Sequence, residues 1–146
     1  MTPGRTGERA AVRMAHEQDM AAAYALRHEV FVLGQDVPEE LERDEYDAVG
    51  DHAVAVLGGA VVGTGRLLQD GTIGRMAVLS AARGGGVGAA VLAAHEAQAR
   101  ARGLLSVQLH AQVHAQAFYE RAGYTAYGAV YVEAGIDHVS MRKSLG

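Results

Sequence analysis

A glycine-rich segment, Arg83 to Ala89, is the part of the sequence best suited to hold a charged ligand. It reads Arg-Gly-Gly-Gly-Val-Gly-Ala, and it lies between an apolar stretch, Ile73 to Leu79, and an alanine-rich stretch of helical character. The first N–H groups of a helix lack intrahelical partners and lie at the positive end of the helix dipole. Glycines let a bulky anion approach those groups closely. The segment therefore predicts a phosphate or pyrophosphate site where a helix begins.

Two common phosphate-binding loops do not fit this segment. It lacks the Gly-Lys-Ser/Thr ending of a nucleotide P-loop, so no lysine can reach a terminal phosphate. A dinucleotide-binding loop requires an acidic residue about twenty positions later, and this chain has Val107, Gln108 and Leu109 there. A glycine-rich turn that only packs a helix onto a sheet remains the alternative.

A second motif follows, Phe-Tyr-Glu-Arg-Ala-Gly-Tyr at Phe118 to Tyr124. Together with Arg-x-x-Gly-x-Gly at Arg83 to Gly88, it resembles the GNAT family of acyl-coenzyme A N-acyltransferases, and the resemblance extends from about residue 11 to the C-terminus. Leu26 to Val32 and His138 to Met141 are similar to a subgroup of small bacterial GNAT proteins. Many of these have Glu-Gln after Val-Phe-Val, where this chain has Gly-Gln at residues 34 and 35.

The resemblance implies an α/β (α+β) fold with one mixed, mostly antiparallel sheet flanked by helices. Its fourth and fifth strands would run parallel and splay apart, and the pantetheine arm would pair with the unpaired backbone in the gap. We expect a flexible N-terminal tail over residues 1–10 and one GNAT domain over residues 11–146.

The resemblance also assigns residues to acetyl-CoA, the expected acyl donor. The implied cofactor-binding residues are Met76, Ala77, Val78, Arg83, Gly84, Gly85, Gly86, Val87, Gly88, Ala89, His114 and Phe118. Phe118 and the side chains of Met76 and Val78 also fit a role in the core. Tyr119 matches the tyrosine that protonates the departing thiolate in many GNAT enzymes. A phenol is protonated at neutral pH, so it can donate; an aromatic ring that only packs is the alternative.

Several residues could accept the proton of the amine, and the sequence does not choose among them. The candidates are Glu29, Asp44, Asp47, His52, His110 and His138, and a water molecule could serve instead. His110 alternates with Gln108 and Gln112 on one face of a predicted strand. The acidic run from Glu39 to Glu45 is most simply a solvated helix face.

An arginine pair is a further candidate for binding the acceptor. Asp70-Gly71 is a strong signal for a two-residue hairpin, which would place Arg66 directly opposite Arg75. Two opposed arginines repel each other unless an anion lies between them. The anion could be a carboxylate or phosphate of the acceptor, or an internal acid such as Glu29. The expected acceptor-binding residues are therefore Glu29, Arg66, Arg75, His110 and His138.

Periodicity and turn residues predict the elements that position these groups. We expect strands over 11–14, 53–57, 60–68, 72–79, 106–112, 126–132 and 138–143. Helices are expected from Met20 to about Val32, capped by Asp19, and from Pro38 to Arg43. A long helix should follow the glycine loop and end at Gly103, and a short one should contain Tyr119.

Composition narrows the class of protein. The chain has 146 residues, enough for one domain, and no cysteine, which excludes disulfides, thiolate metal sites and cysteine nucleophiles. A net charge of −4 argues against a nucleic-acid surface. No signal peptide or membrane-spanning run is present, so we expect a cytoplasmic protein. We also expect no bound metal. Whether it forms a homodimer stays open.

The predicted function is transfer of an acetyl group from acetyl-CoA to a primary amine of a small molecule. The amine would attack directly in a ternary complex, and the acceptor could be anionic. A non-catalytic acyl-CoA-binding sensor or interaction module is the alternative.

Overall fold

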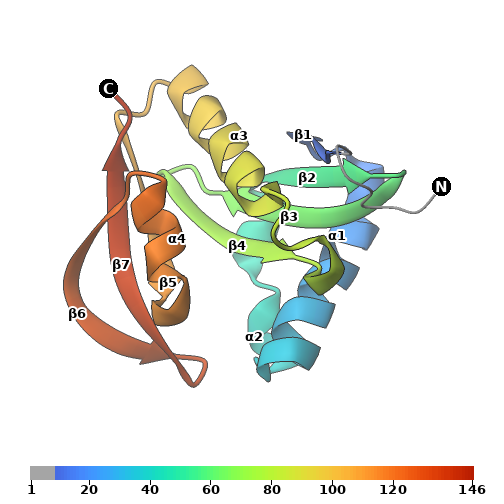
Figure 1. The fold of residues 1–146 in the computed structure, drawn as a ribbon, viewed down its shortest axis with the longest axis horizontal. Helices are drawn as coiled ribbons and strands as arrows, with labels where there is room; N and C mark the ends of the chain where they lie inside the picture. The colour runs from blue at the N-terminus through green and yellow to red at the C-terminus, as the bar shows by residue number, and fades with distance from the viewer. Residues whose placement is uncertain (1–8) are drawn as a thin grey trace.

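The computed structural model describes residues 9–146, and its central element is one seven-stranded sheet (Figure 1). Residues 1–8, most of the expected N-terminal tail, lie outside the described residues. The strand order is β1-β2-β3-β4-β5-β7-β6, and every neighbouring pair is antiparallel except β4 and β5. The strands are β1 (Ala11–Met14), β2 (Asp51–Leu57), β3 (Ala60–Leu67), β4 (Thr72–Val78), β5 (Ser106–Gln112), β6 (Thr125–Glu133) and β7 (Ile136–Ser144).

The helices also fall where the sequence predicts them. They are α1 (Met20–Arg27), continued by a π-helical segment η2 (His28–Leu33), α2 (Glu39–Glu42), α3 (Val87–Ala101) and α4 (Gln116–Arg121). Short 3-10 turns are η1 (Glu17–Asp19), η3 (Glu45–Ala48), η4 (Ser80–Ala82) and η5 (Val113–Ala115). The expected cap of α1 is wrong in detail: the Asp19 carboxylate accepts from the His16 N–H and from Arg13.

Alternation along β3 shows which helix covers which face. A side chain at Gly63 would collide with Val87, and one at Gly65 with Val91, so these residues face α3 at close approach. Arg66 points to the opposite face, where it meets Asp44 and other residues that follow α1. The sheet therefore lies between α3 on one side and the α1–η3 region on the other.

The parallel strands β4 and β5 diverge, as the resemblance to the GNAT family implies. They pair only at Thr72 with Gln108 and at Ile73 with Leu109, and Figure 1 shows the two ribbons separating beyond that point. The last residues of β4, from Gly74 to Val78, therefore have no ladder partner on the β5 side. Unpaired strand backbone of this kind can bind a ligand that carries amide groups.

The register predicted for the β3–β4 hairpin is wrong by one residue. The Leu68 N–H donates to the Thr72 carbonyl, so the loop contains three residues instead of two. Arg66 consequently pairs with Gly74, not with Arg75. The original register returns farther along, where Thr64 pairs with Ala77, because Arg75 forms a bulge with a φ of +50°.

His95 is a fully buried histidine in the middle of α3. No hydrogen bond within the described chain reaches either ring nitrogen, and the ring packs against Gly65 of β3. Burial lowers the pKa of His95 to about 4 from its ordinary 6.5, because the charged form loses its hydration.

This histidine predicts a specific acid sensitivity. Between pH 6.5 and 4 the unfolded chain binds a proton at His95 that the native state does not, so stability falls as the pH falls. The loss amounts to about 3 kcal/mol over that range. Urea unfolding at several pH values should show a flatter dependence for His95→Leu than for the parent chain, and parallel curves would contradict the assignment.

Candidate active site

The glycine segment forms the start of α3, as expected. Gly86 is the residue before the helix, has a φ of +81°, and makes no side-chain cap. Residues 83–86 are exposed, and no backbone hydrogen bond within residues 9–146 engages the N–H groups of Val87, Gly88 and Ala89, which begin α3. Arg83 folds back over this end, and its Nε donates to the Val78 carbonyl at 3.1 Å. The backbone is thus open to an anion, and the assignment of these residues to the cofactor stays a prediction.

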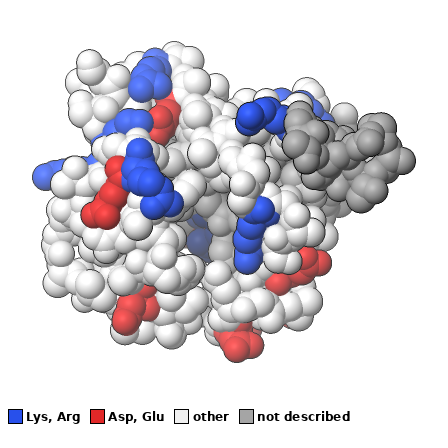
Figure 2. Space-filling model, in the orientation of Figure 1, with Lys and Arg blue, Asp and Glu red and all other residues white. Residues whose placement is uncertain are grey.

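The surface around this loop is hollowed. Figure 2 shows a depression between the side formed by α4 and the side formed by η4, with basic side chains visible in and beside it. A concave, positively charged surface next to free helix N–H groups suits a pyrophosphate.

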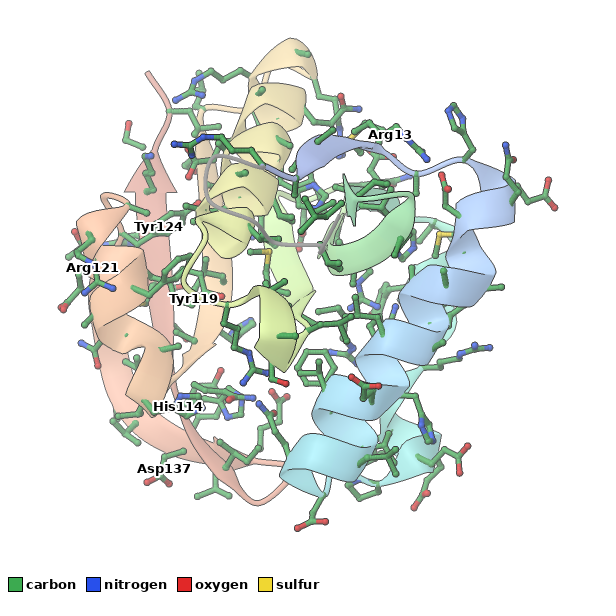
Figure 3. The ribbon with its side chains drawn as sticks, turned by 45° about the vertical axis from the view of Figure 1, so that its right-hand side comes forward. Arg13, His114, Tyr119, Arg121, Tyr124 and Asp137 are labelled. Atoms are coloured by element: carbon green, nitrogen blue, oxygen red, sulfur yellow. The ribbon has the colours of Figure 1, made fainter. Side chains whose placement is uncertain are left out.

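Tyr119 lies on the inner side of α4, between that helix and the sheet (Figure 3). Its ring makes edge contacts with Phe118 at 5.0 Å and Tyr124 at 6.0 Å between centroids. Burial raises the pKa of Tyr119 to about 12, so its hydroxyl keeps its proton at physiological pH. Among residues 9–146 no hydrogen bond engages that hydroxyl, which leaves it free to donate to a ligand.

Phe118 joins α4 to the glycine loop. A Cβ atom added at Gly88 would lie 3.4 Å from the Phe118 ring, and Phe118 also packs against the core cluster that contains Leu92. The Phe118 ring therefore packs in the core, as its apolar character predicts. Its contact with the cofactor stays a prediction.

The structure overturns the arginine pair as an acceptor clamp. Arg66 Nη1 lies 2.7 Å from Asp44 and 2.9 Å from Asp47, and only 5% of the Arg66 surface is exposed. Arg75 Nη2 lies 3.1 Å from Asp44. Both guanidinium groups are tied to internal acids, so the argument for an anionic acceptor is lost.

These residues belong to a larger cluster, which we name the arginine–carboxylate network. Arg27, 1% exposed, donates from Nε to Glu42 at 2.8 Å and from Nη1 to Asp47 at 2.7 Å. The network consists of Arg27, Glu42, Asp44, Asp47, Arg66 and Arg75. All three acids come from the stretch around α2 and η3. The interpretation of the acidic run as a solvated face holds for its exposed glutamates, residues 39, 40 and 45, but it is wrong for Glu42 and Asp44, which pair with the arginines.

Charge pairing shifts the titration of the network. Burial alone would raise the pKa of Asp47, but hydrogen bonds from Arg27 and Arg66 hold it well below its usual range. Burial alone would lower the pKa of Arg27, but Asp47 and Glu42 raise it. Burial, together with the positive charge of Arg66, lowers the pKa of Arg75. Asp44 and Asp47 already accept hydrogen bonds from arginines, which removes both as candidates for the proton acceptor.

His110 and His138 lie on the sheet face opposite Leu109 and Val139, two residues of the core cluster that α3 and α4 cover. Tyr131 joins the two histidines: its hydroxyl lies 2.7 Å from His110 Nδ1, and its ring stacks on His138 at 5.8 Å. Alternation along the predicted strand did not indicate Tyr131, because a bulge interrupts β6 between Tyr127 and Tyr131.

A glutamine bridge spans the two sides of the diverging strands. Gln112 of β5 donates to the Gln35 side chain, beyond η2, at 2.8 Å. The Gln112 side-chain oxygen Oε1 accepts from His114 Nε2 at 2.5 Å, and Figure 3 shows His114 below Tyr119. The sequence predicts only that Gln112 shares a strand face with His110. It does not predict the contact between Gln112 and Gln35, which is 77 residues away.

The remaining candidates are placed as follows. His52 is occupied, because its Nε2 lies 2.9 Å from the Asp47 carbonyl oxygen. Glu29 is exposed on η2, away from the arginines. No group of three metal-ligating side chains occurs within residues 9–146. In the same region no helix has the length and apolar character needed to cross a membrane.

The diverging parallel strands, the exposed glycine loop at a helix start and the half-buried tyrosine of α4 are the features of an acyl-CoA N-acyltransferase architecture. The family model described as an acetyltransferase (GNAT) domain matches residues 12–145. The chain therefore belongs to the GNAT acetyltransferase family.

Relatives of known sequence and structure agree with this assignment. The chain is 36% identical to the uncharacterized N-acetyltransferase YjcF of Bacillus subtilis, over 91% of this chain and 98% of that protein. An acyl-CoA N-acyltransferase from Pseudomonas aeruginosa superposes with a TM-score of 0.80 at 36% identity, covering 92% of this chain and 99% of that one. Escherichia coli ElaA gives a TM-score of 0.80 at 27% identity, with coverage of 92% and 99%.

Proposed function

We propose that the protein transfers the acetyl group of acetyl-CoA to a primary amine of a small molecule by direct attack in a ternary complex. One observation carries the proposal: Tyr119, whose hydroxyl keeps its proton and has no hydrogen bond within residues 9–146, contacts Phe118, and Phe118 in turn lies against Gly88 at the start of α3. Direct attack is favoured over an acyl-enzyme intermediate, because the chain has no cysteine that could act as the nucleophile.

The residues divide the work in this proposal. The N–H groups at the start of α3 bind the pyrophosphate, and the unpaired β4 backbone at Met76 and Val78 binds the pantetheine arm. The amine nitrogen attacks the thioester carbonyl carbon, and the C–S bond breaks as Tyr119 gives its proton to the sulfur. The nitrogen releases one proton to solvent, and solvent returns one to Tyr119. The products are the N-acetyl amine and coenzyme A with a protonated thiol.

The proposed function is tested by incubating the purified chain with acetyl-CoA and separate panels of amino acids, aminosugars, polyamines and peptides. We expect thiol release that depends on both protein and amine, and an acetylated product in the mass spectrum. If acetyl-CoA binds but no panel supports release above the amine-free control, the protein is a non-catalytic acyl-CoA-binding module.

The glycine loop offers a separate test of cofactor binding. Gly86→Asn should weaken acetyl-CoA binding at least tenfold, about 1.4 kcal/mol, because asparagine tolerates a positive φ but adds a side chain beside the anion site. Calorimetry on the folded variant measures the change.

Gly103 supplies the matched control for this substitution. It ends the same helix with a φ of +79°, and a Cβ atom there would meet nothing within 4 Å. Gly103→Asn should bind acetyl-CoA like the parent chain. If the Gly86 and Gly103 variants bind acetyl-CoA with equal affinity, the pyrophosphate does not bind at the start of α3.

A further inference from the structure

The ring of His138 is held in one orientation and one tautomer. Its Nδ1 lies 2.7 Å from the carbonyl oxygen of Ile136. A carbonyl oxygen can only accept, so Nδ1 carries the proton, and Nε2 of the neutral ring has a bare lone pair. No hydrogen bond from the described part of the chain reaches this Nε2.

Packing fixes the ring as well. His138 is 8% exposed, and Tyr131 stacks on it with an interplanar angle of 23°. The Tyr131 hydroxyl is itself anchored, 2.7 Å from His110. A base oriented by a third group is the arrangement found where proton transfer must be fast.

Register places this histidine next to the diverging strands. His138 lies opposite Gln112 of β5, three residues beyond Leu109, the last β5 residue that pairs with β4. Antiparallel partners share a face, so His138 and Gln112 lie on the face opposite the one that packs against Tyr119. A thioester between β4 and β5 would thus have Tyr119 on one side and His138 on the other.

By register, the titratable and charged groups that share this face with His138 are Tyr127 and Tyr131 of β6, His110 of β5 and Arg142 of β7, and Gln112 connects the face to His114 of η5. No carboxylate of residues 9–146 bonds to the His138 ring. The acids of the arginine–carboxylate network and His52 are engaged elsewhere.

We propose that Nε2 of His138 is the general base that takes the proton from the acceptor amine, and that Tyr131 is a positioning residue for it. This inference rests on the proposed acetyl transfer. As the N–C bond forms and the C–S bond breaks, the amine proton passes to Nε2 while Tyr119 protonates the sulfur. Solvent then removes the proton from His138 and returns one to Tyr119, so protons and charge balance.

The decisive variant is His138→Asn. The asparagine Nδ2 occupies the place of Nδ1, so it can still donate to Ile136, whereas no atom replaces Nε2. With the best amine of the panels, we expect kcat/KM at pH 7 to fall about a hundredfold while the acetyl-CoA Kd stays unchanged. The loss should shrink as the pH rises, because hydroxide in the solvent can then take the proton that the nitrogen releases.

His16→Asn is the matched control, since His16 is exposed at η1 and bonds through its backbone. It should keep the activity and pH profile of the parent chain. Tyr131→Phe retains the stacked ring and should lower kcat with the pH profile unchanged.

Two results would overturn the inference without touching acetyl transfer. One is a His138→Asn variant that keeps the activity and the pH profile of the parent chain. The other is a hundredfold loss in the His110→Asn variant while His138→Asn stays active. Nitrogen chemical shifts of the His138 ring provide a readout that needs no turnover. They should show the Nδ1–H tautomer, and an Nε2–H tautomer would refute the assignment.

Discussion

Replacing Arg27 by methionine should destabilise the protein by about 3 to 5 kcal/mol, the cost of removing one partner from a buried ion pair. The substitution keeps the apolar volume but leaves Glu42, which is 4% exposed, with only the more distant Arg75 at 3.3 Å, and it removes one of the two arginines that hold Asp47. Because domains are stable by only about 5 to 15 kcal/mol, the loss should be visible as a large fall in the urea midpoint.

Arg13→Met is the matched control. Arg13 also forms a two-hydrogen-bond pair, with Asp19, but at the surface, where such pairs contribute little. Its urea midpoint should stay close to that of the parent chain. If both variants unfold at the same urea concentration, the arginine–carboxylate network is not what holds α2 and η3 against the sheet.

The network also bears on the candidate site, because Arg75 is the bulged residue of β4. Its side chain donates to the Glu42 carbonyl oxygen at 3.0 Å and to Asp44 at 3.1 Å. These bonds hold the residue at a φ of +50°, an unfavourable conformation that tertiary contacts must stabilise. The β4 backbone beyond it is the stretch that has no partner on β5. The buried charges therefore help to fix the strand that the proposal assigns to pantetheine.

Local signals in the sequence sufficed for the elements and for the type of fold. The strand at Ser106–Gln112 matches its prediction at both ends, and α3 begins inside the glycine loop. Alternation, helix periodicity and glycine punctuation are properties of neighbouring residues, so they can be read without the fold. The motifs at Arg83 and Phe118 supplied the family.

Contacts between distant residues could not be predicted in this way. The acids near α2 lie in a polar stretch of sequence, and their burial depends on arginines 15 to 33 positions away. A signal was nevertheless present: Arg27 follows the apolar face of α1, and Arg66 lies inside an apolar strand. A buried guanidinium requires carboxylates, so such positions predict partners without identifying them.

The β3–β4 register failed for a similar reason. A loop one residue longer and the bulge at Arg75 compensate each other, so the two ends of the hairpin obey different registers. The bulge depends on the network behind it. Tyr131 and the Gln112–Gln35 bridge were missed because both lie across strand or loop pairings of long sequence separation.

Tyr119→Phe should lower kcat about a hundredfold or more, the usual effect of losing a general acid. Phenylalanine keeps the ring contacts with Phe118 and Tyr124, so folding and acetyl-CoA affinity should not change. Only the proton for the departing sulfur is lost, and kcat and kcat/KM should fall together, as expected for an interaction made in the transition state. Steady-state assays of thiol release measure kcat, and calorimetry with acetyl-CoA measures the affinity.

The pH dependence sharpens this test. With a pKa near 12, Tyr119 remains protonated from pH 6 to about pH 10, so the parent chain should show no alkaline loss of activity from this group. Tyr46→Phe, at a tyrosine that is 49% exposed on η3, serves as the matched control and should leave kcat unchanged. If Tyr119→Phe turns over as fast as Tyr46→Phe with the best amine, the thiolate leaves without a protein acid. Tyr119 would then act only through packing, since its ring joins Phe118 and the start of α3 to the core.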